Sequence, residues 1–298
     1  MRKLVSVSAV LVLLLVTASS LVASDSAGVV RIGIVADVHV HDTNSPNEHK
    51  VMTNYEPRLA AFVAAMTAWP ADTVISLGDL VNGVFVMGAE LGDPARVPAL
   101  LDHAVTLLRG FPGEIHYVLG NHDVYNLSKS QFLAGTGTPS VYYSFDVGGY
   151  HLVILDAQFN KSGQDYEHVS WMVQGTIPPA ELEWLRTDLA STEKPTIVCV
   201  HQPLDLAFEL LAGGPPISNA AEVRAALVAS GRVIAVFQGH THDSAHTVMD
   251  GIHYVTFAGM VDHEVPTPPS WAAVSLDPVA RTIRIDGTGL QESLELTY

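Results

Sequence analysis

The sequence contains little cysteine and little positive charge. Cys199 is the one cysteine among 298 residues, so no intramolecular disulfide can form. The fold must depend on its core, with bound metal as a further support. Lys and Arg number 15 against 31 Asp and Glu, for a net charge of -16, which argues against non-specific binding of nucleic acid or anionic membranes. A small phosphorylated substrate would need a local source of attraction, such as bound cations.

Long apolar runs are absent beyond the N-terminus. Arg2 and Lys3 precede an apolar block at 4–16, and small residues follow as far as Ala23, which is the layout of a secretory leader. We expect residues 1–23 to be a signal peptide, or an uncleaved anchor because the run approaches spanning length. The protein is then exported, periplasmic or extracellular, with no membrane contact beyond the leader. Residues 29–290 are expected to form one domain, and no feature predicts an oligomeric state.

Repeats of solenoid period and low-complexity segments are also absent. Apolar β-type runs instead alternate with helical patterns in the first half of the chain, which predicts a mostly parallel sheet with covering helices. Residues 141–156 predict an antiparallel hairpin around a Gly-Gly turn. The predicted strands are 29–36, 73–77, 115–119, 141–146, 150–156, 196–200 and 233–237, with antiparallel strands at 252–257, 271–276 and 282–285. The predicted helices are 57–66 with Pro57 at its first position, 97–109, 179–189 and 220–229.

Polar residues follow five of the predicted strands. They are Asp37-x-His39, Gly78-Asp79, Gly120-Asn121-His122-Asp123, His201 and Gly239-His240-x-His242. Alone, each aspartate is explained as a turn or cap residue. Together, they are expected to converge, because the carboxyl ends of strands in an α/β sheet meet at one edge. Carboxylate, amide and imidazole groups at one edge predict a metal centre.

These five motifs, in this order, resemble the calcineurin-like metallophosphoesterase superfamily. The resemblance implies an α/β fold, a four-layer α/β/β/α sandwich of two mixed sheets. It implies one ion bound by Asp37, His39 and His242. It implies a second ion bound by Asn121, His201 and His240, with Asp79 bridging the two. Such a mixture of oxygen and imidazole ligands suits Mn, Fe or Zn without choosing among them.

The resemblance also implies a function. It is a dinuclear-metal-dependent hydrolase that cleaves phosphodiester or pyrophosphate bonds of nucleotide-like substrates by attack of a metal-activated hydroxide. His122 is expected to protonate the leaving oxygen, and Tyr125 and Asn126 to contact the substrate. Residues 120–126, 181–185, 239–243 and 251–255 look most like the manganese-dependent ADP-ribose/CDP-alcohol diphosphatase group. Asn82 stands where the superfamily often has aspartate, which leaves open the residue that orients His122.

Three other functions fit parts of the sequence. An exported phosphomonoesterase would use the same centre. Asp37-x-His39-x-His41 matches the opening motif of amidohydrolase barrels, which predicts a metal-dependent amidohydrolase if eight βα units follow. A non-enzymatic metal-binding protein would keep the ligands but show no turnover.

Overall fold

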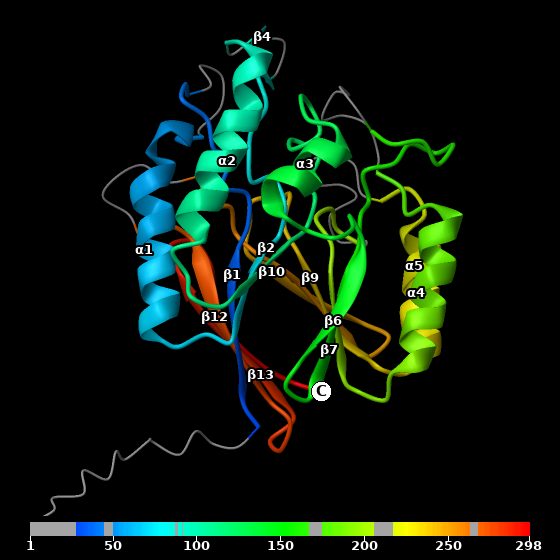
Figure 1. Ribbon diagram of the computed structural model, residues 1–298. Helices are drawn as coiled ribbons and strands as arrows, with labels where there is room; N and C mark the ends of the chain where they lie inside the picture. Colours follow the sequence, from blue (N-terminus) through cyan, green and yellow to red (C-terminus); the bar gives the residue numbers. More distant parts are fainter. Residues whose placement is uncertain are drawn as a thin grey trace, which may run out of the picture.

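The computed structural model describes residues 28–44, 50–86, 89–90, 92–166, 175–205, 217–262 and 268–298. Its two mixed six-stranded sheets face each other, and helices cover their outer faces (Figure 1). This is the α/β/β/α sandwich that the resemblance to the metallophosphoesterase superfamily implies. The predicted signal peptide, residues 1–23, lies outside the described residues. No helix in the described part of the chain has the length and apolar character needed to cross a bilayer.

Each sheet combines parallel and antiparallel pairs. The first has the order β14-β13-β12-β1-β2-β5, and the second β10-β11-β9-β8-β7-β6. The first sheet comprises β1 Val30–Val35, β2 Thr73–Ser76, β5 Glu114–Tyr117, β12 Trp271–Asp277, β13 Thr282–Thr288 and β14 Leu294–Thr297. The second comprises β6 Tyr143–Val147, β7 Tyr150–Ile154, β8 Thr196–Cys199, β9 Val233–Gln238, β10 Ala245–Met249 and β11 Ile252–Thr256. A separate ribbon pairs β3 Phe85–Val86 with β4 Ala89–Glu90.

The helices form the two outer layers. They are α1 Tyr55–Ala68, α2 Val97–Leu108, α3 Lys129–Thr136, α4 Pro179–Ser191 and α5 Ala220–Ser230, with short 3₁₀ turns at Met52–Asn54 and Pro94–Arg96. Figure 1 shows α1 and α2 beside the first sheet and α4 and α5 beside the second.

Three apolar cores hold these layers together. Side chains of α1 and α2, among them Phe62 and Leu101, pack against the first sheet. Ile34 and Phe237 belong to a second core between the two sheets, and Leu185 of α4 lies in a third core between the helices and the second sheet. Each of these fully buried side chains stabilises the fold by about 1.5–3 kcal/mol relative to an exposed position. The sandwich is therefore bound by apolar burial on both faces of each sheet.

Parallel pairing gives several neighbouring strands of each sheet the same direction. β1, β2 and β5 are parallel neighbours, as are β7, β8, β9 and β11. Their carboxyl ends therefore lie at one edge of each sheet, where the polar motifs begin.

The structure corrects several predicted elements. Helix α1 begins at Tyr55 rather than at Pro57, which is possible because the first-turn N–H groups of a helix have no internal partner. Strand β11 pairs parallel with β9, so the antiparallel prediction for 252–257 holds only for its pairing with β10. Helix α3 and strands β10 and β14 were not predicted, and β14 extends the first sheet to Thr297, past residue 290.

The architecture also decides one functional alternative. An amidohydrolase barrel closes eight parallel strands into one ring, whereas this chain forms two open six-stranded sheets. The amidohydrolase prediction is therefore wrong. His41, the residue that suggested it, is buried and its Nδ1 lies 3.0 Å from both the backbone N and the carbonyl O of Thr43.

Candidate metal centre

The predicted ligands and the predicted proton donor His122 all lie beyond the carboxyl ends of strands that have a parallel neighbour. The loops after β1, β2 and β5 of the first sheet supply Asp37, His39, Asp79, Asn121 and His122. The loops after β8 and β9 of the second sheet supply His201, His240 and His242. The first two loops run side by side, since His39 N donates to Asp79 O at 2.9 Å. Both sheets therefore contribute to one cluster.

The first predicted ion site forms a compact group. One ligand atom each from Asp37, His39 and His242 lies within 4.8 Å of the others. His39 Nε2 is 3.1 Å from His242 Nε2, and His242 Nε2 is 3.4 Å from Asp37 Oδ1. Two ligands of a tetrahedral ion at 2.0–2.1 Å would be about 3.4 Å apart. The spacing therefore suits a single cation.

The second predicted site lies beside the first. Asp79, His201 and His240 form another group within 4.8 Å, and Asn121 Oδ1 lies 3.2 Å from His201 Nε2. Asp79 Oδ2 is 3.2 Å from His201 Nε2 and 3.5 Å from His39 Nε2. Asp79 is thus placed between the two groups, as a bridging carboxylate must be.

Unsatisfied polar atoms at the cluster support a metal. Asp37 Oδ1 and His240 Nε2 are buried and have no hydrogen-bond partner among the described residues. A buried polar atom left unpaired costs about 1–3 kcal/mol, and such atoms are rare unless a ligand or water meets them. A cation between these atoms would remove that cost. The residues present therefore fit a pair of divalent ions.

The charges within the cluster are strongly coupled. Burial raises the pKa of Asp37. Burial acts in the same direction on Asp79, but His201 and His122 outweigh it and hold the pKa of Asp79 well below its usual value. For His201, burial is outweighed by Asp79, which raises the imidazole pKa to about 9. A bound cation would therefore compete with a proton at His201, because metal ligands must be deprotonated.

The backbone is strained at the ligands themselves. Asp37, His39, Asp79, His240 and His242 have left-handed conformations, with φ between 49° and 73°. This conformation destabilises a non-glycine residue by roughly 1–2 kcal/mol. Such strain is concentrated at functional sites. The left-handed positions in these loops therefore coincide with the predicted ligands.

Two glycines make room for neighbouring ligands. A Cβ on Gly78 would lie 2.7 Å from His201 Cγ, and one on Gly120 would lie 2.9 Å from Asp79 Cγ. Gly78 also has a φ of +96°. The glycine of each of these motifs is therefore required because a ligand from another strand lies against it.

Four residues of the site were not assigned by the sequence. The Asp262 carboxylate is paired with Nδ1 of His242, and Asn82 Oδ1 lies 2.7 Å from Nδ1 of His39. Asp123 accepts from the backbone N–H of Gly120 and Val81 at 2.9 Å each, which ties the loop after β5 to the loop after β2. Burial, with the nearby Asp79, raises the pKa of Asp123 to about 7. Asp262 lies in the loop after β11, which ends at Thr256. A carboxylate in a loop after a predicted strand was the sequence feature that could have identified it.

Lys50 is the fourth of these residues. Together with burial, its positive charge lowers the pKa values of His39 and His122. The neighbouring Val51 donates its backbone N–H to Val261 O at 3.1 Å, and Val261 precedes the Asp262 that pairs with His242. Lys50 therefore adds positive charge to the electrostatic environment of His39 and His122.

The two predicted substrate contacts occupy different surroundings. The Tyr125 ring is buried, with its centroid 4.5 Å from that of His122. Asn126 Oδ1 accepts the backbone N–H of Val84 at 2.8 Å, so its carbonyl oxygen is used to hold the loop. The substrate-contact roles of both residues stay predictions.

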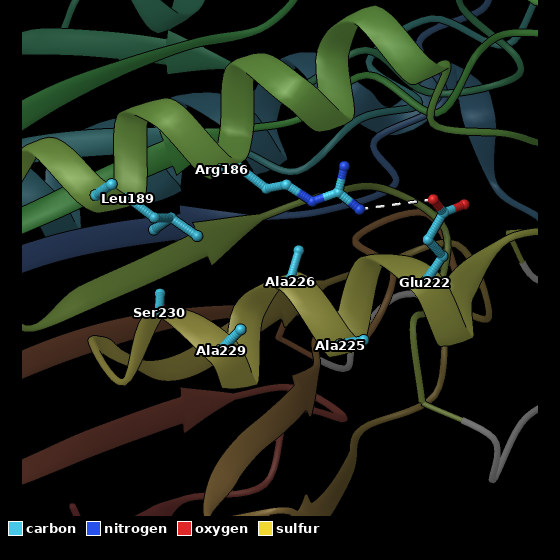
Figure 2. Close-up of a pocket in the computed structure, with 8 residues that line it drawn as sticks. Arg186, Leu189, Glu222, Ala225, Ala226, Ala229 and Ser230 are labelled. Atoms are coloured by element: carbon cyan, nitrogen blue, oxygen red, sulfur yellow. Dashed lines mark ion pairs between the residues drawn. The ribbon is translucent and has the colours of Figure 1, made fainter.

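A separate groove lies between α4 and α5, away from this cluster. Figure 2 shows its small lining side chains and the ion pair between Arg186 Nη2 and Glu222 Oε1, 3.6 Å apart. Its volume is about 390 Å³, and none of the predicted metal ligands lines it. The candidate site is therefore the cluster at the strand ends.

Comparison with known proteins agrees with this geometry. The profile of the calcineurin-like phosphoesterase family matches residues 30–244. A manganese-dependent ADP-ribose/CDP-alcohol diphosphatase from Xenopus laevis is 25% identical over 89% of this chain and 90% of its own length. A protein of the same description from Oryza sativa subsp. japonica is 23% identical over 81% of this chain and 85% of its own. Among solved structures, a dimetal phosphatase from Danio rerio superposes with a TM-score of 0.74 at 19% identity, covering 91% of this chain and 99% of its own.

Proposed function

Because this chain belongs to the calcineurin-like phosphoesterase family, and is a metal-dependent hydrolase of phosphoester or diphosphate bonds, we propose that its substrate is a small pyrophosphate-linked nucleotide such as ADP-ribose. The observation that carries the proposal is the paired cluster, with Asp79 between the two groups of candidate ligands. The relatives that span most of this chain are named for ADP-ribose and CDP-alcohols, both pyrophosphate-linked.

The protein side chains would hold the ions and orient the phosphoryl group. One ion would be held by Asp37, His39 and His242. The other would be held by Asn121, His201 and His240, and Asp79 would touch both. When bound, such a pair of ions acidifies water and offsets charge on the phosphoryl oxygens. We propose manganese, named in the relatives, over iron or zinc.

We propose that His122 acts on the leaving group. Its ring centroid lies 4.5 Å from that of His39, with the planes at 76°, and its Nδ1 lies 3.0 Å from the carbonyl O of Asn82. Nδ1 therefore donates, and Nε2 is left for the substrate. Burial lowers the pKa of His122 to about 3, so the free enzyme holds it neutral. The negative charge of an arriving substrate opposes this shift. Nε2 would then take up a proton from solvent, and the imidazolium would deliver that proton to the leaving oxygen and return to its neutral form.

Lys50 supports a substrate with more than one phosphate. In a pyrophosphate, one phosphoryl group would be held by the two ions and the other would lie farther from them. Lys50 supplies positive charge near His39 and His122, in a protein whose net charge is -16. An ammonium beside the second phosphate would favour pyrophosphates over monoesters.

The test compares substrates on one enzyme preparation. The full-length protein is stripped with a chelator, reloaded with Mn²⁺, Fe²⁺ or Zn²⁺, and assayed on ADP-ribose, bis-p-nitrophenyl phosphate and p-nitrophenyl phosphate. We expect kcat/KM to be highest for ADP-ribose with Mn²⁺. Higher kcat/KM on the monoester would identify a phosphomonoesterase instead, and metal uptake without turnover would identify a metal-binding protein.

We also propose that the protein is exported. The support is the sequence of residues 1–23, with basic, apolar and small-residue sections in the order of a secretory leader. Fractionation of expressing cells, with mass spectrometry of the mature N-terminus, tests this proposal. An unprocessed chain retained in the cytoplasm would contradict it.

A further inference from the structure

Asn82 lies at the point where the loops after β1 and β2 touch. Its backbone N–H donates to Val40 O at 3.2 Å, and the preceding Val81 forms an isolated parallel bridge with Val40. The Asn82 side chain is completely buried. It therefore occupies a fixed position between the predicted ligand His39 and the predicted proton donor His122.

The side-chain amide of Asn82 has one possible orientation. Its Nδ2 donates to Gly83 O at 3.2 Å, and its Oδ1 lies 2.7 Å from His39 Nδ1. Because an amide oxygen only accepts, His39 must carry its proton on Nδ1. In the neutral imidazole, the form that binds a metal ion, one ring nitrogen carries the proton and the other carries the lone pair. His39 Nε2 is then left with a lone pair, 3.1 Å from His242 Nε2 and 3.5 Å from Asp79 Oδ2.

The backbone of the same residue acts on the second histidine. The carbonyl O of Asn82 lies 3.0 Å from His122 Nδ1, and a carbonyl also only accepts. His122 therefore carries a proton on Nδ1 as well. The side chain and the backbone of Asn82 thus fix the tautomers of two neighbouring imidazoles by separate contacts.

We infer that Asn82 is a positioning residue for both histidines: its amide presents His39 Nε2 to a metal ion, and its carbonyl presents His122 Nε2 to the substrate. The inference rests on the proposed function for what the two Nε2 atoms bind. An aspartate at this position would also accept from His39. It would add a negative charge to a cluster that already contains Asp37, Asp79 and Asp123, whereas asparagine keeps the contact neutral.

The tautomers test the inference without any metal. Nitrogen-15 NMR of the imidazoles in the metal-free, full-length protein should show both His39 and His122 protonated on Nδ1. In Asn82→Ala, His39 should lose this preference while His122 keeps it, because the backbone carbonyl remains. Wild-type protein with either ring protonated on Nε2 alone would overturn the inference.

Metal binding gives the second readout. Equilibrium dialysis with Mn²⁺ should show that Asn82→Ala lowers the affinity of one of the two ion sites by about 10–100-fold, the usual effect of losing the hydrogen-bond partner of a metal ligand. The affinity of the other site should change by no more than about threefold. Asn82→Asp should restore the affinity of the weakened site for Mn²⁺. Adding Asn82→Ala to His39→Ala should cause no further loss, because the side chain acts through His39. An equal loss of Mn²⁺ affinity at both sites, or no recovery of affinity in Asn82→Asp, would overturn the inference.

The control removes a comparable asparagine elsewhere. Asn219 donates to Ile177 O at 2.8 Å and accepts from Ile177 N at 3.1 Å, outside the centre. Asn219→Ala should lower the unfolding temperature without changing Mn²⁺ content. Wild-type protein that binds no Mn²⁺ would overturn the proposed function, and the tautomers would still decide whether Asn82 orients the two rings.

Discussion

Gly78→Ala is expected to destabilise the protein more than alanine at another glycine with a similar backbone. Gly78 has a φ of +96°, and a Cβ there would lie 2.7 Å from His201 Cγ. Gly251, in the turn between β10 and β11, has a φ of +81° and no heavy atom within 4 Å of the Cβ position. The pair separates backbone strain, which both share, from crowding of a predicted ligand, which only Gly78 has.

The magnitudes follow from these two terms. A left-handed non-glycine residue costs roughly 1–2 kcal/mol, so Gly251→Ala should lower the free energy of unfolding by that amount. At Gly78 the crowded imidazole is completely buried and its Nδ1 lies 2.8 Å from Leu77 O, so it cannot move away freely. Overpacking of a filled interior adds about 1–3 kcal/mol, for a total of roughly 2–5 kcal/mol in Gly78→Ala.

The assay is thermal or urea unfolding of both variants in their metal-free state, followed by Mn²⁺ binding. The additional loss of unfolding free energy in Gly78→Ala, compared with Gly251→Ala, corresponds to a further fall of roughly 2–6 °C in Tm, at about 2 °C per kcal/mol for a domain of this size. The Gly78→Ala variant should also bind the ion at His201 more weakly, and Gly251→Ala should not. Equal destabilisation of the two variants with unchanged metal binding would refute crowding of His201 as the reason that this motif carries glycine.

Three further predictions concern the chemistry and the charge networks. His122→Ala should lower kcat by about 10²–10⁴-fold on alkyl phosphoesters and less on p-nitrophenyl esters, whose leaving group needs no proton; equal losses would contradict the acid role. Lys50→Ala should lower kcat/KM for ADP-ribose about tenfold or more and leave p-nitrophenyl phosphate nearly unchanged, while the exposed Lys161→Ala serves as a control that changes neither. A hydrogen bond to Asp188 outweighs burial and raises the pKa of His151 above 6.5. The stability difference between wild type and His151→Gln should therefore be complete below about pH 6.5 and shrink as pH rises through the folded pKa, and a difference constant from pH 5 to 9 would count against this network.

The motifs predicted which residues meet because of a simple property of parallel strands. Asp37 and His242 are remote in sequence, yet their side chains meet, since both follow strands whose carboxyl ends lie at the same side of the sandwich. Periodicity located the long helices and most central strands, because the faces of these elements that pack inside the sandwich must be apolar.

Other features depended on packing that no local pattern records. The eight residues of α3 include few apolar ones, and the helix is fixed by the Ser128–Gln131 capping box and by Gly137 at its end. Asp262 reaches His242 only because β11 lies parallel beside β9. Asn82 was noticed for its departure from aspartate, but its two separate contacts depend on how the loops after β1 and β2 meet.

The two sheets share no strand, although each contributes ligands to the same centre. The distance from His39 to His242 is therefore set by how Ile34 and Phe237 and their neighbours stack in the apolar layer between the sheets. A small sliding of one sheet over the other would change every ligand spacing that crosses the interface. Activity should consequently be sensitive to volume changes in this remote layer, even where the loops that carry the ligands are left intact.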